Sequence, residues 1–273
     1  MWVSPTLEAH RQLDYALRLD WGLEGADAVA PGCDVVVVVD VLSFTTTLTV
    51  AADRGTVVYP YRWRDGSAER FAADRDATLA VGRSQADAGQ VSLSPASVRA
   101  APRLPRLVLP SPNGSTISFR LADAVTTVLG VSLRNRQAAA RWLLRRREVA
   151  PRLRVAIVSA GERWPGGSLR PAVEDQWGAG ALVTALTAAG WPGVSPEARA
   201  AAGAFEAVAD DVGAALRECA SGRELVDLGY PDDVDTAAQL DQSDAIPVLR
   251  GEAYVPGEAP ELGTDWTHGG GRA

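Results

Sequence analysis

The segment from residue 34 to residue 42 constrains the fold most strongly. It reads Asp-Val-Val-Val-Val-Val-Asp-Val-Leu, which is apolar and β-branched without any polar alternation. A strand with one face in water would alternate, so this pattern predicts a strand covered on both faces, as in the centre of a parallel sheet. Hydroxyl side chains follow at once, and Gly55 ends the helix predicted after them. The segment therefore predicts a strand followed by a helix.

The same order of strand and helix recurs along the chain. The pattern predicts strands at 57–61, 78–81, 106–109, 125–131 and 155–159, and helices at 66–75, after residue 115, at 134–147 and at 173–189. Such alternation is typical of an α/β fold, here a three-layer α/β/α arrangement around a mostly parallel, mixed sheet. Two late strands, 246–249 and 252–255, are predicted at an edge of the sheet, because Pro247 cannot donate a hydrogen bond to a neighbouring strand.

We expect residues 1–256 to form a single α/β domain. Within it, residues from about 195 to 245 are rich in alanine and predict a helical lobe, with a break near Ser221-Gly222. Residues 257–273 are rich in glycine and proline and predict a flexible tail. No signal-peptide pattern and no apolar run long enough to span a bilayer is visible, so a cytoplasmic location is expected and no membrane partner.

Composition excludes several classes of function. All 27 basic residues are arginine, so a Walker A loop and a Schiff-base lysine are excluded. The net charge of −7 argues against a nucleic-acid partner. The chain has only two cysteines and two histidines, which argues against a disulfide framework, a CxxC zinc site and catalysis by a central histidine. Arginine suits oxyanions, so a small anionic ligand remains compatible with the composition.

The first candidate segment for chemistry follows the buried strand. Asp40 at its end could hold a divalent cation. Ser43, Thr45 and Thr46 lie where the next helix begins, and the N–H groups and dipole of a helix N-terminus attract anions. The alternative is that Asp40 caps the turn and the threonines cap the helix.

Two other strand ends carry residues suited to binding an anion. Asn113, Gly114 and Ser115 predict a tight turn whose backbone donors could cradle a phosphate, although an ordinary connection would have the same sequence. Arg83 follows the short strand at 78–81 and could clamp an oxyanion, or it could belong to a surface loop.

The remaining candidates follow the strand at 155–159. Gly161 and Glu162 come directly after it, and Glu174 and Asp175 begin the next helix. These carboxylates could bind Mg²⁺ or act as a general acid or base, or they could only stabilise the helix dipole. Because ligands of open α/β sheets bind at the carboxyl ends of strands, we expect Asp40 and the Glu174/Asp175 pair to meet beside the Asn113 turn.

Taken in order, these motifs resemble the 2-phosphosulfolactate phosphatase family. The resemblance covers roughly residues 30–255, and it implies a Mg²⁺-dependent hydrolase acting on 2-phosphosulfolactate or a related small phosphorylated acid. It further implies Asp40, Glu174 and Asp175 as metal ligands or acid/base groups, and a homodimer. The matching segments are Val39 to Leu42 with Thr45 to Thr47, Ser94-Pro95, Asn113 to Ser115, Ser132 to Asn135, Ala160-Gly161, Glu174-Asp175 with Gly180, Ser221-Gly222 with Leu225 and Gly229, Asp233, and Ile246-Pro247.

The chain departs from the family's pattern at four places, one of which is Ser111-Pro112-Asn113-Gly114-Ser115, where the family has Thr-Thr-Asn-Gly-Thr. Family members have Arg-Ala at Ser43-Phe44, Gly-Glu-Arg at the segment from Gly82 to Ser84, and Gly-Asn at Ser92-Leu93. These changes leave two other functions open. One is a non-catalytic protein that binds an anion or metabolite on the same fold. The other is a different enzyme, such as a transferase or lyase, that acts on another small acidic metabolite.

Overall fold

The structure is a computed structural model that describes residues 8–62, 66–87, 89–122 and 127–257. Its centre is a nine-stranded mixed sheet, which confirms the predicted α/β class. The order of its strands across the sheet is β1 (Leu17–Trp21), β7 (Val155–Ser159), β2 (Val35–Val39), β6 (Thr127–Val131), β10 (Ile246–Arg250), β11 (Ala253–Gly257), β3 (Val57–Tyr61), β5 (Arg106–Pro110) and β4 (Thr78–Leu79).

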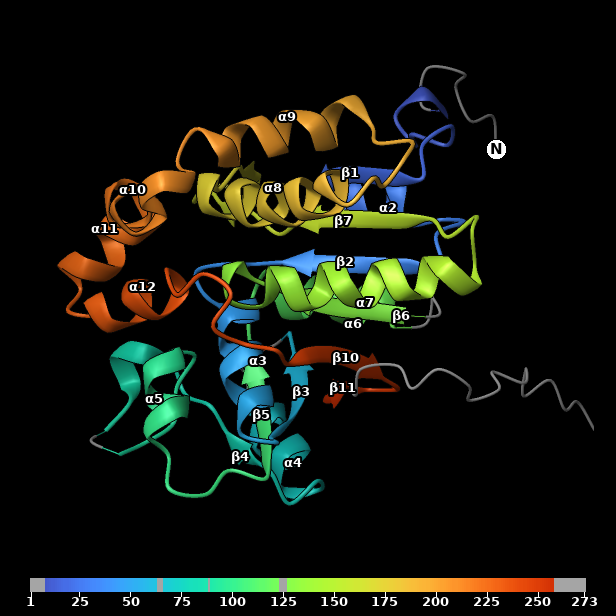
Figure 1. Cartoon of the computed structure of the whole chain (residues 1–273). Coiled ribbons are helices and arrows are strands. Elements are labelled where there is room, and N and C mark those ends of the chain that lie inside the picture. Colours follow the sequence, from blue (N-terminus) through green and yellow to red (C-terminus); the bar gives the residue numbers. More distant parts are fainter. Residues whose placement is uncertain (1–7, 63–65, 88, 123–126, 258–273) are drawn as a thin grey trace, which may run out of the picture.

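The sheet consists of two parallel blocks joined by a hairpin. Strands β1, β7, β2 and β6 form the first block, and β3, β5 and β4 form the second. The β10–β11 hairpin joins β6 through Val248 and Leu249, and joins β3 through the single pair Tyr254 with Val58. The strands of the two blocks point in very different directions: in Figure 1, β2 is horizontal, whereas β5 is vertical.

The edge position predicted for the two late strands is wrong, because β10 and β11 lie in the interior of the sheet. Pro247 is tolerated there for a local reason. It pairs with Pro256 inside the hairpin, and it lies outside the short ladder that links Val248 and Leu249 to β6.

Helices cover both faces of the first block. One face carries α7 (Arg136–Val149) and α8 (Val173–Ala188), and the other carries α2 (Gly22–Val29), α3 (Phe44–Asp53) and α6 (Gly114–Leu121). Successive valines of β2 alternate between the two cores: Val35, Val37 and Val39 pack into one, Val36 and Val38 into the other. All five are fully buried, at about 1.5–3 kcal/mol each. The continuous apolar run is thus the consequence of a three-layer fold.

The alanine-rich lobe comprises α9 (Pro196–Glu206), η3 (Ala209–Asp211), α10 (Val212–Glu218), α11 (Ala220–Asp227) and α12 (Pro231–Ala237). The predicted break near Ser221-Gly222 lies two residues too late, since the helices separate at Cys219. In Figure 1, α10, α11 and α12 lie beyond the carboxyl end of β2. The lobe therefore lies beside the candidate site.

The remaining short elements are α4 (Ser67–Ala73), η1 (Arg83–Gln85), α5 (Pro95–Ala100), η2 (Leu133–Asn135), β8 (Glu162–Arg163) and β9 (Leu169–Arg170). Among the described residues, no helix combines the length and apolarity needed to cross a membrane. The tail predicted to be flexible lies, from residue 258 onward, outside the described residues.

Candidate active site

Four acidic side chains from three segments meet at the carboxyl ends of β2 and β7; we call them the acid rim (Asp40, Glu162, Glu174 and Asp175). Asp40 follows β2, Glu162 begins β8 just after β7, and the other two lie in the first turn of α8. Asp175 fixes this geometry, because its Oδ1 accepts the Val41 amide at 2.7 Å and its Oδ2 accepts the Gly161 amide at 2.8 Å. One carboxylate thus joins the ends of two neighbouring strands.

Asp40 connects the rim to the second block of strands. Its Oδ1 accepts the Phe44 amide at 3.1 Å, and its Oδ2 accepts the amide of Gly114, which follows β5, at 2.9 Å. A Cβ atom at Gly114 would lie 2.3 Å from the Phe44 ring and 2.7 Å from Asp40 Oδ2, so only glycine fits. Beside it, Asn113 donates to Glu162 at 3.0 Å. The expected meeting of Asp40, Glu174 and Asp175 next to the Asn113 turn is present.

Burial gives the rim unusual electrostatics. Burial, followed by the negative charge of Glu162, raises the pKa of Asp40 to about 7. Burial and then the charge of Asp40 raise the pKa of Asp175 well above its ordinary value. Burial also raises the pKa of Glu162, although Asn113 and Arg170 oppose that change. Neighbouring carboxylates in a poorly solvated place repel one another, so a cation there would be strongly attracted.

The carboxylate oxygens of the rim suit a Mg²⁺ ion that takes only one or two of its ligands from the protein. Within the described ranges, no group of three or more His, Cys, Asp or Glu side chains is arranged to hold a metal. Mg²⁺ needs fewer, since one or two carboxylates with water and substrate oxygens suffice. Asp40 and Asp175 already accept two amides each, so Glu162 and Glu174 are the better candidate ligands. Cys219 beside Glu174 is a poor ligand, because burial raises its pKa to about 12.

Three residues predicted to bind phosphate, Thr45, Thr46 and Ser115, have hydroxyl groups that point into the protein. Thr45 Oγ1 donates to the Asp40 carbonyl at 2.8 Å, and Thr46 Oγ1 donates to the Val41 carbonyl at 2.7 Å. Ser115 Oγ donates to the Leu109 carbonyl at 2.9 Å. All three residues are fully buried. These hydroxyls stabilise the turns after β2 and β5, and their side chains do not face a ligand.

Two arginines adjoin the rim. Arg170 is the cross-strand partner of Glu162 in the β8–β9 pair, and its Nη2 lies 3.3 Å from Ser221 Oγ. Arg83, predicted as an anion clamp, donates from Nε to Asp233 Oδ2 at 2.8 Å and from Nη2 to Ser43 Oγ. Arg170 therefore places positive charge beside Glu162, whereas Arg83 is paired with Asp233 and reaches the turn after β2 through Ser43.

The sequence indicated Glu162 as a possible metal ligand or acid/base group, but the ligand set implied by the family resemblance was Asp40, Glu174 and Asp175. The sequence pattern that indicates Glu162 is an acidic residue directly after a predicted strand, the same pattern as for Asp40. Sequence reasoning missed roles for Arg170 and Asp233, because neither follows a buried strand and both reach the region through the packing of β9 and α12. Gly161 is positioned as expected, with φ of +67°, but its amide is already bonded to Asp175.

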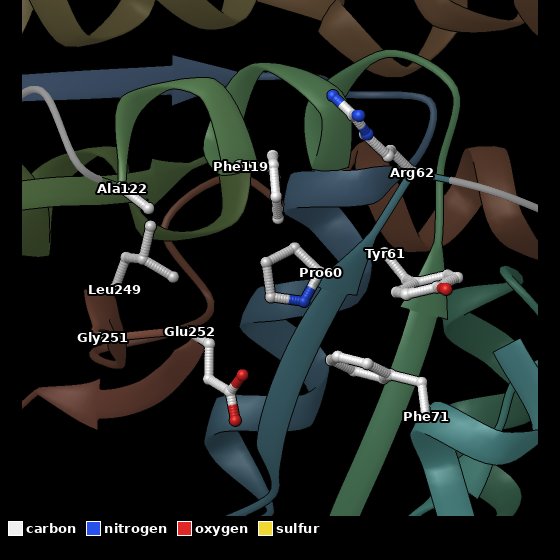
Figure 2. Close-up of a pocket in the computed structure, with 9 residues that line it drawn as sticks. All are labelled: Pro60, Tyr61, Arg62, Phe71, Phe119, Ala122, Leu249, Gly251 and Glu252. Atoms are coloured by element: carbon white, nitrogen blue, oxygen red, sulfur yellow. The ribbon is translucent and has the colours of Figure 1, made fainter. Parts of the chain in front are cut away.

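A cavity of about 400 Å³ lies apart from the acid rim. Figure 2 shows Tyr61, Phe71, Phe119 and Leu249 arranged around Pro60, between β3, α6 and the β10–β11 turn. The lining is mostly apolar, and no residue of the acid rim contributes to it. The cavity and the concentration of charge are thus two separate features of the molecule.

Comparison with known proteins gives a consistent result. A family model described as 2-phosphosulpholactate phosphatase matches residues 26–252. Three similar proteins are each named "Probable 2-phosphosulfolactate phosphatase". The one from Synechococcus sp. is 31% identical over 233 residues (79% of this chain, 87% of the relative), that from Thermus thermophilus 34% over 225 residues (80% and 89%), and that from Deinococcus radiodurans 32% over 233 residues (82% and 89%). This chain therefore belongs to the 2-phosphosulpholactate phosphatase family.

Proposed function

We propose that the chain is a Mg²⁺-dependent phosphomonoester hydrolase. Its substrate would be 2-phosphosulfolactate or a closely related small phosphorylated acid, split by water into the free acid and phosphate. The observation that carries the proposal is the acid rim, where carboxylates from the end of β2, from β8 and from α8 converge and Arg170 lies opposite Glu162. The names of the relatives support the same reaction.

Within this proposal the four acids have different roles. Glu162 and Glu174 would hold the Mg²⁺ ion, which when bound polarises phosphoryl oxygens and lowers the pKa of a bound water. Asp40 suits proton transfer, because its pKa of about 7 is close to the pH at which a cell works. Asp175 would act by holding the Val41 and Gly161 amides in place.

The phosphate would approach from the Arg170 side. A guanidinium presents planar, paired N–H donors that match phosphate oxygens, and Arg170 sits opposite Glu162 in the β8–β9 pair. The Asn113 amide group already donates to Glu162, so it keeps that carboxylate oriented toward the same place. Binding of the phosphate and of Mg²⁺ would therefore be coupled, because the bound cation reduces the repulsion between the phosphate and the carboxylates.

The test is release of phosphate from 2-phosphosulfolactate by the purified full chain, with Mg²⁺ or with EDTA. We expect release that requires Mg²⁺. Circular dichroism confirms folding in both conditions. A folded, Mg²⁺-supplied protein that releases no phosphate would contradict the proposal, and intact substrate that binds without turnover would indicate the non-catalytic alternative.

A further inference from the structure

A buried ion pair lies against the turn that follows β2. Asp233 of α12 is 1% exposed, and it accepts a hydrogen bond from Arg83 Nε at 2.8 Å. The same guanidinium donates to Ser43, the residue before Phe44, whose amide binds Asp40. The ion pair is therefore linked to the acid rim through the turn that holds Asp40.

Asp233 is held from several sides and is itself inaccessible to a ligand. Its Oδ1 accepts from Ser94 Oγ and, at 3.4 Å, from the Ala96 amide, while its Oδ2 accepts from Arg83. A buried carboxylate is costly unless such contacts compensate for lost water. Its partners come from η1 and the start of α5, so the contacts fix the position of the Arg83 side chain relative to both.

Arg83 retains the capacity to bind an oxyanion. A guanidinium has five N–H donors, and within the described part of the chain the hydrogen bonds of Arg83 go to Asp233 and Ser43. Its side chain is 16% exposed, and its Cζ atom lies 5.9 Å from the centre of the Tyr230 ring. The group is thus oriented on one side and still reachable from solvent.

We infer that Arg83 binds the acidic group of the substrate that is not transferred, a carboxylate or a sulfonate, and that Asp233 is its positioning residue. This inference rests on the proposed function. Arg170 is the cross-strand partner of Glu162, whereas Arg83 donates to Ser43, which precedes the residue whose amide binds Asp40. Two guanidiniums arriving from different elements match a small substrate with two separate anionic groups.

Three substrates separate this role from phosphate binding. 2-Phosphosulfolactate carries a sulfonate and a carboxylate, 2-phospholactate carries only the carboxylate, and isopropyl phosphate carries neither. For Arg83→Gln we expect KM to rise about 10- to 100-fold on substrates whose acidic group it binds, with kcat nearly unchanged. Hydrolysis of isopropyl phosphate should be unaffected.

Asp233→Asn should change KM in the same direction with the same substrate preference. If Asp233 acts only through Arg83, the double variant should be no worse than Arg83→Gln alone. Arg120→Gln is the matched control, since Arg120 pairs with Asp27 on the surface, and it should leave all three reactions unchanged. Should Asp233→Asn fail to fold, Arg83→Lys tests the same geometry, because it keeps the charge and loses the planar fork. It should then show a raised KM on the acidic substrates only.

An equal loss on all three substrates, or no change on any, would overturn the assignment. If the wild-type chain hydrolyses none of them, the proposed function fails while the inference stays testable by calorimetry with sulfolactate alone. Binding that weakens at least about tenfold in Arg83→Gln would still support it. Equal affinity in both proteins, or no binding to the wild type, would overturn it.

Discussion

The acid rim and the cavity around Pro60 differ in what they can offer a ligand: the rim offers charge and the cavity offers space. The cavity has room, about 400 Å³, lined mostly by apolar side chains, and Glu252 at its border is already paired with Arg75 at 2.6 Å. The rim instead concentrates carboxyl groups, and those of Asp40, Glu162 and Asp175 have raised pKa values. Perturbed acids in a buried cluster indicate chemistry more directly than an apolar hollow with neutralised charges does. If the proposed function is correct, reactivity belongs to the rim, and the same substitution made in both regions should have unequal effects.

The largest difference is expected between Glu174→Gln and Glu252→Gln. Loss of a candidate metal ligand should lower kcat/KM for 2-phosphosulfolactate at least about 100-fold, as for metal sites whose ligands or supporting contacts are removed. The identical change at the border of the cavity should leave activity within about twofold, because an exposed ion pair contributes little. Steady-state kinetics of both variants checks this. Similar activities in the two variants would remove the distinction between the regions.

Gly114→Ala tests how the rim is built. The added methyl would collide with Phe44 and with Asp40 Oδ2, so we expect a loss of about 1–3 kcal/mol in the free energy of unfolding. Displacement of Asp40 should also lower activity about 10- to 100-fold. Gly203→Ala is the control, since nothing lies within 4 Å of a Cβ there and alanine favours a helix. Normal stability and activity in Gly114→Ala would show that Asp40 is not held as described.

The pH dependence of stability distinguishes the rim from the rest of the chain. The pKa of Asp40 rises on folding from 3.8 to about 7, so its neutral form is favoured in the native state. Protonated Asp40 therefore stabilises the native state, and this contribution is fully present below about pH 4. It is lost as the pH rises toward 7, by roughly 1.4 kcal/mol for each pH unit. The chain has only two histidines, so few other groups titrate between pH 5 and 8.

Urea unfolding at pH 5 and pH 8, with EDTA or with Mg²⁺, measures this effect. Metal-free protein should be less stable at pH 8, and Mg²⁺ should restore much of the loss by neutralising the carboxylates. Metal-free stability that stays constant or increases over this interval would mean that the rim is better solvated than its burial indicates.

The smallest effect is expected for Phe119→Ala in the cavity. The side chain is 54% exposed, and the Arg62 guanidinium lies 4.8 Å from its ring centre. We expect a change of less than about 1 kcal/mol in the free energy of unfolding and no change in turnover. Thermal unfolding and the phosphate assay measure both. A marked loss of activity would connect the cavity to the reaction.

Local patterns predicted the parts of the site that depend on strand ends. Asp40, Asn113 and the Glu174/Asp175 pair each lie within a few residues of a strand end or a helix start, so the parallel arrangement brings them together. The sequence does not show which way a hydroxyl points, and Thr45 bonds to its own turn. A residue type suited to an anion is equally suited to closing a turn.

Non-local packing explains the other differences. The order of strands depends on contacts between residues far apart in the chain. The β10–β11 hairpin, for example, lies between the two parallel blocks and pairs with β6 on one side and with β3 on the other. Strand β1 escapes prediction because it contains Arg18, which is fully buried and donates to the carbonyls of Tyr15, Val29 and Pro31. Asp233 reaches Arg83 only because the helical lobe packs beside the rim.

Calorimetric titration of the metal-free chain with Mg²⁺ tests the central claim most directly. We predict one Mg²⁺ site per chain, weaker as the pH falls through 7 because protons compete for the rim, and lost in Glu174→Gln but retained in Glu252→Gln. No binding to the wild type, or equal binding to both variants, would contradict it.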